Sequence, residues 1–273
     1  MTDLNDSPLG HSSTYVHPYD PGLLFPVERA PQRAALGLAA PLPFEGVDQW
    51  TAYELSWLDP TGKPQVAIAT LAVPAESPFI VESKSLKLYL IALNQTHFAG
   101  ADDVRAVIQH DLTKAIGARV EVGLVEPFAF DTLSRGELEG TWLDDMQLAV
   151  HDNAPAPQRL VAAGDVVEEA LCTRLFRSVC PVTGQPDYAS VQVRYRGPRI
   201  DPAGLLAYLV SFRRHPGFHE HCVERIFVDV WQRCAPEALA VYARFTRRGG
   251  IDINPFRSHG FPLPTASVRT ARQ

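Results

Sequence analysis

Hydrophobic and polar residues alternate in two stretches that flank a short turn-forming sequence. The stretches are WTAYELSWL, residues 50–58, and QVAIATLAV, residues 65–73, and between them lies DPTGKP. Strand-like alternation on both sides of a segment rich in Asp, Pro and Gly is typical of a β-hairpin. The chain is therefore predicted to pair these two stretches as antiparallel strands.

The pattern then changes to a helical period. In VESKSLKLYLIALNQ, residues 81–95, Leu86, Leu90 and Leu93 recur at the spacing of one helix face. A second helix is predicted over 101–117, with Asp102 as its N-cap. The segments RVEVGLVEP and WLDDMQLAVHD, which follow this helix, are predicted strands.

The second half of the chain repeats this order. The segments VVEEALCTRLFRSVC and YASVQVRYRG form an extended pair, although periodicity alone leaves a helix open for the first of them. A helix is predicted to begin at Asp201 as N-cap and Pro202 as first residue, and another begins near Cys222. ALAVYARF and IDINP follow as strands, with Phe245 on the same side as Val241.

Internal repetition of this kind predicts two domains of one architecture. We expect an irregular N-terminal arm at 1–45, a first domain at 46–155 and a second at 156–273, joined near the Pro- and Ala-rich stretch NAPAPQ. Each domain has the order of two strands, two helices and two strands.

Composition restricts the class of protein. The chain of 273 residues is 46% hydrophobic and 21% charged, which is ordinary for a globular protein that buries a core. A net charge of −6 disfavours a dedicated nucleic-acid-binding protein. No run approaches the roughly 18 apolar residues of a membrane span, no secretory signal is visible, and the four cysteines are too few for a disulfide framework. We expect a cytoplasmic protein with reduced thiols.

Cys180 differs from the other three cysteines. Cys172, Cys222 and Cys234 lie in apolar segments, where a thiol is usually a small buried hydrophobic group. Cys180 begins the loop CPVTGQPD, which ends with Asp187. A thiol beside an acid in such a loop is a candidate nucleophile, whereas structural roles for both residues remain the alternative.

The sequence FHEHC, residues 218–222, contains side chains that bind zinc. The spacing favours no metal, because residues i and i+2 of a helix point apart and no second cluster of Cys and His is present. Glu220 is a candidate acceptor for the N–H groups of a ligand, and an exposed acid at a helix start is its alternative.

Two cationic segments are candidate anion sites. Arg247 and Arg248 precede Gly249 and Gly250, which combines guanidinium groups with close backbone approach. Lys84 and Lys87 lie at a helix start that Ser83 is expected to cap. The G-x-G-x-x-G and phosphate-loop fingerprints are absent from the sequence, so a nucleotide would be held in another way.

Four blocks in order resemble the 7-cyano-7-deazaguanine reductases (QueF), the NADPH-dependent nitrile reductases of queuosine biosynthesis. The blocks are VESKSLKLYL, SVCPVTGQPD, FHEHCVERIF and TRRGGIDINP, between about Trp50 and Arg257. The resemblance is to the long form and implies an α+β fold of two tandem tunnelling-fold (T-fold) domains, each an antiparallel four-stranded sheet with two helices on one face. It also implies a cytoplasmic homodimer that acts on a small deazapurine, with neither nucleic acid nor membrane as partner. Because the first block lies in one half and Cys180 in the other, it implies a site completed between halves or subunits.

The resemblance assigns roles to individual residues. Cys180 adds to the nitrile carbon to give a covalent thioimide, and Asp187, its pKa raised by burial, protonates the nitrile nitrogen. The substrate-binding positions are Val81, Glu82, Ser83, His219 and Glu220. The positions implied for NADPH are Ser83, Lys84, Arg248 and Gly249. Two NADPH are consumed in each turnover, and no metal is expected.

Two rival functions remain open at this point. One is a zinc-dependent purine or pterin hydrolase of the GTP cyclohydrolase type, with Cys180, His219 and His221 as ligands. The other is a non-catalytic module that binds a purine.

Overall fold

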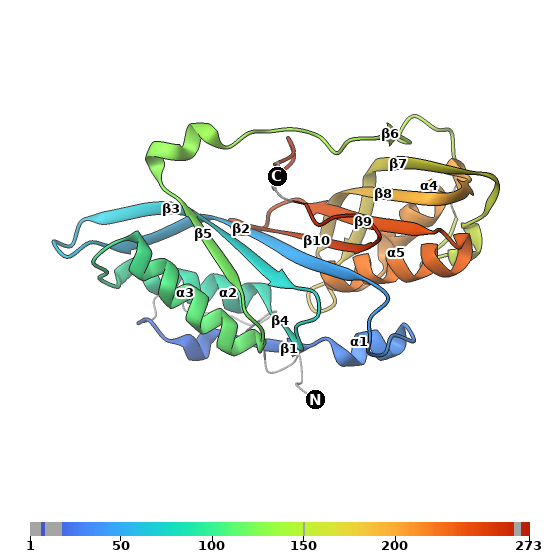
Figure 1. The fold of residues 1–273 in the computed structure, drawn as a ribbon. Helices are drawn as coiled ribbons and strands as arrows, with labels where there is room; N and C mark the ends of the chain where they lie inside the picture. Colours follow the sequence, from blue (N-terminus) through green and yellow to red (C-terminus); the bar gives the residue numbers. More distant parts are fainter. Residues whose placement is uncertain (1–6, 9–17, 150, 265–268) are drawn as a thin grey trace. The chain divides into compact units, whose positions relative to one another are not determined.

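The structure is a computed structural model that describes residues 7–8, 18–149, 151–264 and 269–273. The chain forms two compact units of mixed α and β structure (Figure 1). Unit 1 comprises residues 1–33, 48–134 and 247–252, and unit 2 comprises 34–47, 135–246 and 253–273. The described residues 135–149 and 151–155 belong to unit 2, and residues 247–252 belong to unit 1.

The secondary-structure elements follow the predicted order, with several additions and with one predicted strand missing. The strands are β1 (Pro26–Glu28), β2 (Glu45–Leu58), β3 (Pro64–Pro74), β4 (Phe79–Val81), β5 (Glu121–Val125), β6 (Thr141–Trp142), β7 (Ala162–Val179), β8 (Pro186–Ile200), β9 (Ala238–Phe245) and β10 (Ile251–His259). The α-helices are α1 (Ala30–Ala35), α2 (Ser83–Ala92), α3 (Ala101–Ile116), α4 (Pro202–Val210) and α5 (His219–Cys234). Short 3₁₀-helices lie at Pro21–Leu23, Leu93–Gln95, Pro127–Thr132, Pro157–Arg159 and Ser211–Arg214.

In unit 1 the strands run in the order β5-β3-β2, and α2 and α3 lie on one face of this sheet (Figure 1). β3 and β5 are antiparallel, with Ile68 opposite Val125. The hairpin prediction is confirmed, and Asp59 in its turn accepts hydrogen bonds from the backbone N–H groups of Thr61 and Lys63. Leu86, Leu90 and Leu93, the predicted helix face, are all buried.

Two predicted helix caps in unit 1 are wrong. Gly100 is the N-cap of α3, and Asp102 lies inside the first turn, where it pairs with Arg105 three residues on. In α2 the cap is Glu82, whose carboxylate accepts from the N–H groups of Lys84 at 2.6 Å and Ser85 at 2.8 Å. This longer side chain reaches back to the free amides of the first turn, so Ser83 becomes the first helical residue.

In unit 2 the strands run in the order β10-β9-β8-β7-β6 (Figure 1). β7, β8, β9 and β10 pair antiparallel with their neighbours, and β6 pairs parallel with β7. Residues 166–179 are extended and lie in β7, which settles the ambiguity of this segment's periodicity. α4 and α5 pack on this sheet, and Asp201 caps α4 as predicted, with Pro202 as its first residue.

The strand predicted at 142–152 is wrong over its described residues, which include only the end of β6. Asp144 explains the difference, because its carboxylate accepts hydrogen bonds from Thr173 Oγ1 at 2.7 Å and the N–H of Arg174 at 3.0 Å. These bonds hold the segment as a turn against β7. Unit 1 therefore does not gain from this segment the fourth strand that the repeated order requires.

The N-terminal arm, expected to be irregular, contains β1 and α1 among its described residues. β1 pairs antiparallel with β4, with Val27 opposite Ile80. Arg29, at the end of β1, forms a buried ion pair with Asp48 at 2.6 Å. Pairing with a strand far along the chain orders this segment, and local periodicity does not reveal such a partner.

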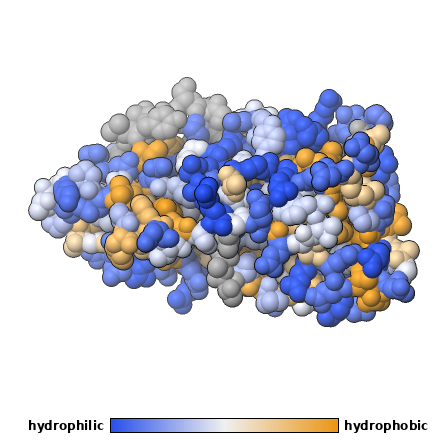
Figure 2. Space-filling model, turned by 90° about the horizontal axis from the view of Figure 1, so that it is seen from above, coloured by the Kyte–Doolittle hydropathy of each residue, from blue (hydrophilic) through white to orange (hydrophobic). Residues whose placement is uncertain are grey.

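No helix within the described part of the chain is long and apolar enough to cross a membrane. On the face seen in Figure 2, hydrophilic residues cover most of the surface and hydrophobic residues form separate patches.

Candidate active site

Cys180 lies at the closed end of the β7–β8 hairpin, directly after the last residue of β7. Its N–H donates to the carbonyl of Gln185 at 2.8 Å, and its own carbonyl accepts from the N–H of Gly184 at 3.0 Å. Gly184 adopts φ +67°, a conformation that favours glycine and closes the loop tightly. The Cys180 side chain is 6% exposed. The hairpin therefore holds the thiol in a fixed, shielded position.

Asp187 lies on the same face of this hairpin as Cys180. In the β7–β8 register Asp187 is opposite Ser178, and Val179 is opposite Pro186. Opposite residues of a sheet share a face, so Ser178 and Asp187 lie on one face. Cys180 lies two residues beyond Ser178, just past the strand, where its backbone still pairs with Gln185, and it continues the alternation toward that face. Diagonal neighbours of this kind have backbones about 7–8 Å apart, a distance that side chains and a small substrate can bridge. Asp187 is 5% exposed, so this acid is shielded together with the thiol.

The start of α5 is tied to the end of β7. Val179 N–H donates to the carbonyl of His215 at 3.0 Å, and the carbonyl of Val179 accepts from Gly217 N–H at 3.1 Å. Val179 also forms an isolated parallel bridge with Pro216. These contacts bring the first turn of α5, with His219 and Glu220, to the strand end that precedes Cys180.

His219 connects the acid to the sheet. Its Nε2 lies 3.5 Å from Oδ2 of Asp187. Its ring stacks on Phe245 of β9, with 3.8 Å between centroids and 6° between planes. Nδ1 of His219 is buried and has no hydrogen-bonding partner within the described residues. The imidazole can therefore share a proton with Asp187 and offer its other nitrogen to a ligand.

Phe245 is the residue of this cluster that the sequence did not identify. Its alternation with Tyr242 and Arg244 placed it on the side of Val241, and that side faces α5. The contact between Phe245 and His219 also requires that α5 pack on β9, and no sequence pattern within either element predicts that packing.

Glu220, in the first turn of α5, is 2% exposed, so the alternative of an exposed helix-start acid is wrong. His221, by contrast, packs its ring edgewise against Phe218, with centroids 5.6 Å apart. Within the described residues, no group of three or more His, Cys, Asp or Glu side chains is arranged to hold a metal ion. Cys180, His219 and His221 thus do not form the ligand set of the zinc alternative.

The other three cysteines are buried thiols, as their apolar segments predicted. Burial raises the pKa of Cys172 and of Cys222 to about 12 and that of Cys234 to about 11. These groups are thiols rather than thiolates at neutral pH, and they are poor nucleophiles.

In unit 1, the end of β4 and the first turn of α2 carry the predicted site residues from Val81 to Lys84. Val81 and Glu82 are buried, and Ser83 and Lys84 are half-buried at the helix start. Glu82 N–H donates to the carbonyl of Phe25 at 2.9 Å, and its carboxylate caps the helix. Glu82 therefore fixes where Ser83 and Lys84 begin the helix.

The sequence RRGG, residues 247–250, forms a tight turn in unit 1. Arg248 N–H donates to the carbonyl of Ile251 at 2.9 Å, and Gly249 and Gly250 adopt φ +59° and +79°. A Cβ added to Gly249 would lie 3.1 Å from Cε of Lys87. The turn thus packs against α2 and brings Arg248 to the same region as Lys87 and the start of α2. Cations gathered beside a glycine backbone form a site suited to phosphate groups.

The two sets of residues have different chemistry. Unit 2 holds a shielded thiol, an acid, an imidazole and a buried carboxylate, which are the groups of an enzyme that forms a covalent bond through cysteine. Unit 1 holds Lys84, Lys87 and Arg248 near the glycine turn, a combination of residues suited to an anionic ligand.

Comparison with known proteins identifies the family. The description "Nitrile reductase, 7-cyano-7-deazaguanine-reductase N-term" matches residues 15–124, and "QueF-like protein" matches residues 186–262. A protein of Bordetella pertussis named NADPH-dependent 7-cyano-7-deazaguanine reductase is 57% identical over 271 residues, 99% of each chain. A protein of the same name from Burkholderia vietnamiensis is 56% identical over 98% of each chain. The chain belongs to the 7-cyano-7-deazaguanine reductase family.

A solved structure, the archaeosine synthase QueF-Like in the apo form, aligns with a TM-score of 0.32 and 18% identity. The alignment covers 37% of this chain and 98% of that one.

Proposed function

We propose that the protein reduces the nitrile of 7-cyano-7-deazaguanine to a primary amine with NADPH, as a step of queuosine biosynthesis. The observation that carries the proposal is the arrangement in unit 2, where Cys180 and Asp187 share one face of a hairpin end and His219 contacts Asp187. Membership of the family, at 57% identity over nearly the full length, supports the choice of substrate and reductant.

The first half of the reaction is covalent capture. The deprotonated sulfur of Cys180 forms a bond with the nitrile carbon, and one π bond of the C≡N group breaks. Its electron pair goes to nitrogen, which takes a proton from Asp187. The resulting thioimide has a polarised C=N bond and accepts a hydride far more readily than a nitrile does. His219, 3.5 Å from Asp187, is placed to return a proton to that acid.

The second half delivers the two hydrides. One hydride from NADPH adds to the thioimide carbon, and nitrogen takes a second proton to become an amino group. The nitrogen lone pair then expels the thiolate of Cys180 as the C–S bond breaks, which leaves a protonated imine. A hydride from a second NADPH adds to the carbon of this protonated imine and gives the amine. In sum, one nitrile, two NADPH and two protons give one aminomethyl group and two NADP⁺.

We assign substrate recognition to the buried carboxylate of Glu220, which accepts hydrogen bonds from the exocyclic amine and ring N–H of a guanine edge. His219 presents its second nitrogen to the same ligand. Val81, Glu82 and Ser83 of unit 1 are also proposed as substrate-binding residues. A buried carboxylate favours a ligand that donates N–H groups, because a hydrogen bond to a charged acceptor is stronger than one to a neutral acceptor.

We assign the phosphates of NADPH to the cationic turn and helix start of unit 1. Ser83 and Lys84 begin α2, and Arg248 and Gly249 lie in the turn that packs on it. Gly249 brings backbone close to the ligand, and Lys84 and Arg248 supply positive charge. Two features that the sequence predicted remain part of this proposal: a tunnelling fold for domains 46–155 and 156–273, and a cytoplasmic homodimer.

Nitrile-dependent oxidation of NADPH tests the function. Wild-type protein is expected to oxidise two NADPH for each 7-cyano-7-deazaguanine consumed, and Cys180→Ala is expected to have no turnover while it still binds the deazapurine. Cys222→Ala is the matched control, because it removes a buried thiol of raised pKa, and it should retain activity. Turnover by Cys180→Ala at the wild-type rate would refute the role of this thiol.

The zinc hydrolase alternative makes the opposite prediction. A hydrolase would lose activity with a chelator and would need no NADPH. Activity that resists a chelator and depends on both NADPH and the nitrile excludes the zinc hydrolase. A protein that binds the deazapurine but has no activity would instead support the non-catalytic binding module.

A further inference from the structure

The side chain of Gln273, the last residue of the sequence, is buried in unit 2 and fully hydrogen-bonded. It is 4% exposed. Its amide nitrogen donates to the carbonyl of Phe245 at 3.0 Å and to Oδ1 of Asn254 at 2.7 Å. Its amide oxygen accepts from Nε of Arg244 at 3.1 Å and from the N–H of Thr270 at 3.0 Å. These four bonds use the whole hydrogen-bonding capacity of a primary amide.

Further contacts fix the segment that carries Gln273. Arg272 donates to the carbonyl of Arg174 at 3.0 Å, and Arg269 donates from Nε to the carbonyl of Gln273 at 2.8 Å. Gly136 N–H donates to the carbonyl of Arg269 at 3.0 Å. The segment 269–273 is therefore docked at several points and is not held by one side chain.

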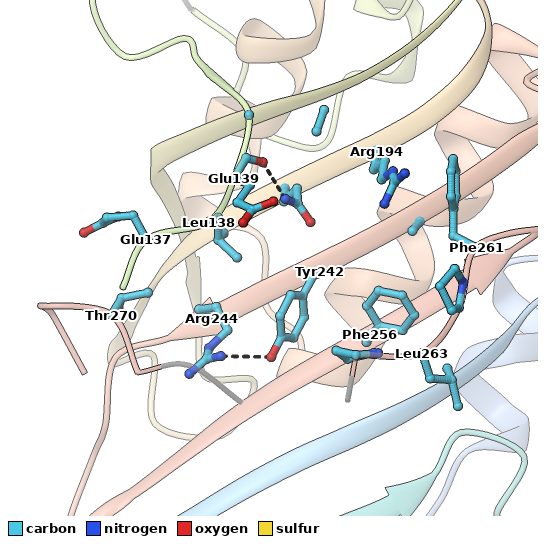
Figure 3. Close-up of a pocket in the computed structure, with 16 residues that line it drawn as sticks. Glu137, Leu138, Glu139, Arg194, Tyr242, Arg244, Phe256, Phe261, Leu263 and Thr270 are labelled. Atoms are coloured by element: carbon cyan, nitrogen blue, oxygen red, sulfur yellow. Dashed lines mark hydrogen bonds between the residues drawn. The ribbon is translucent and has the colours of Figure 1, made fainter. Parts of the chain in front are cut away.

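The same segment borders a cavity of about 810 Å³ on the sheet of unit 2. Figure 3 shows Thr270 at its edge and Arg244 hydrogen-bonded to the hydroxyl of Tyr242, at 2.9 Å. Arg244 is 3% exposed, and Arg194, the other guanidinium of the lining, pairs with Glu168 at 2.6 Å. Because both cations are engaged by the protein itself, Arg244 serves here to orient Gln273 from the cavity side.

The bonds of Gln273 lead to the catalytic cluster through Phe245. Gln273 ties the carbonyl of Phe245, at the end of β9, to Asn254 on β10. The Phe245 ring is fully buried and stacks on His219, and His219 lies 3.5 Å from Asp187. A close-packed interior transmits a shift of one ring to the next. The position of the imidazole beside Asp187 thus depends on where the end of β9 is held.

We propose that Gln273 is a positioning residue that sets His219, and through it Asp187, for protonation of the nitrile nitrogen. The proposal rests on the proposed function, because it concerns the acid of the covalent step. Misplacement of a reacting group by about 1 Å can reduce a rate by roughly a hundredfold, so a remote clamp of this kind has a measurable effect.

The test compares Gln273→Ala, Gln273→Glu and the control Arg272→Ala. Arg272→Ala removes docking bonds of the same segment without a contact to Phe245. We measure the rate of adduct formation on Cys180 with the nitrile in the absence of NADPH, together with kcat, KM for the nitrile and the thermal midpoint. Because NADPH is absent, the adduct rate reports on the thiol and the acid alone.

For Gln273→Ala we expect the adduct rate and kcat to fall by about tenfold or more, with KM for the nitrile changed by less than about twofold. Gln273→Glu should not restore the rate, because a carboxylate still accepts from Arg244 but cannot donate to the Phe245 carbonyl or to Asn254. Arg272→Ala should retain the wild-type adduct rate within about twofold, even if its thermal midpoint falls as far as that of Gln273→Ala.

Phe245→Leu supplies a second variant in case Gln273→Ala fails to fold. This variant keeps the backbone carbonyl of residue 245 that the Gln273 side chain binds, but it removes the ring on which His219 stacks. It should lower the adduct rate by a similar factor. Restoration of the rate by Gln273→Glu, or an equal loss in Arg272→Ala, would reduce Gln273 to a structural anchor and overturn the proposal. If the wild type itself forms no adduct, the proposed function fails and this inference fails with it.

Discussion

At the scale of single residues, the environment of each cysteine separates one candidate nucleophile from three structural thiols. Cys172, Cys222 and Cys234 have pKa values raised by burial to about 12, 12 and 11. Cys180 lies in a loop with a buried acid on the same face of its hairpin. The same residue type therefore performs different tasks according to its neighbours.

This difference predicts selective alkylation. With substoichiometric iodoacetamide at pH 8, Cys180 should be modified first, because the other three thiols are almost entirely protonated and buried. Peptide mass mapping identifies the modified residue, and added 7-cyano-7-deazaguanine should slow the reaction. Preferential modification of Cys222 would contradict this account.

At the scale of elements, the two sites are held by short connections between regular structures. The β7–β8 hairpin end and the start of α5 are joined through Val179, and the turn at 247–250 packs on α2 through Gly249. Changes in these connections should alter one function while leaving the fold in place.

Gly249→Ala tests the cofactor assignment. The residue has φ +59°, and an added methyl group would lie 3.1 Å from Lys87, so the turn and the lysine must shift. We expect KM for NADPH to rise by about tenfold with little change in the rate of adduct formation. Gly62→Ala is the matched control, since φ is +86° and the nearest atom of another residue is 3.8 Å away. Equal kinetic effects in the two variants would refute a specific role of Gly249.

His215 makes the loop beside Cys180 sensitive to acid. Burial, with a smaller effect of Arg225, lowers its pKa in the folded protein from the ordinary value of 6.5. As the pH falls below 6.5, the unfolded chain binds the proton before the folded protein does. The stability contribution of neutral His215 is therefore complete above pH 6.5 and is lost as the pH falls from 6.5 to the lower pKa of the folded protein. The thermal midpoint should therefore fall between pH 7.5 and 5.5 by more in the wild type than in His215→Phe. Equal falls would show that His215 does not contribute.

At the scale of the whole molecule, each unit contains a buried ion pair. Arg29 and Asp48 pair at 2.6 Å in unit 1, and Arg257 and Glu224 pair at 2.9 Å in unit 2. Both partners of the second pair are 0% exposed. Such pairs fix packing more than they add stability, because charge burial offsets their attraction.

Removal of one partner should be costly. Arg257→Met leaves Glu224 buried without its charge partner and should lower the free energy of unfolding by about 3–5 kcal/mol. Arg257→Met with Glu224→Leu should recover most of this loss in denaturant titration. Arg194→Met is the surface control, since Arg194 and Glu168 are 47% and 42% exposed, and it should cost about 1 kcal/mol or less. If Arg257→Met lowered the free energy of unfolding by no more than Arg194→Met does, the burial argument would be contradicted.

Local chemistry explains how much of this molecule could be predicted from its sequence. The hairpins, the Asp201 cap and the common face of Cys180 and Asp187 follow from alternation and turn residues close together in the chain. The turn at Asp144 and the strand β1 were missed, because each depends on a hydrogen-bond partner far along the chain. The cap by Glu82 was missed although its partners are local, because the next residue, Ser83, is of a type preferred at the N-cap. The contacts of Phe245 with His219 and Gln273 lie beyond any periodicity for the same reason.

The most direct test of the central claim is the intact mass of the protein after addition of 7-cyano-7-deazaguanine without NADPH. The account predicts that the wild type gains the mass of one nitrile molecule, that Cys180→Ala gains none, and that Asp187→Asn gains it more slowly. NADPH added afterwards should remove the adduct and return the original mass. An unmodified wild-type mass, or an adduct that persists in Cys180→Ala, would contradict covalent capture by this thiol.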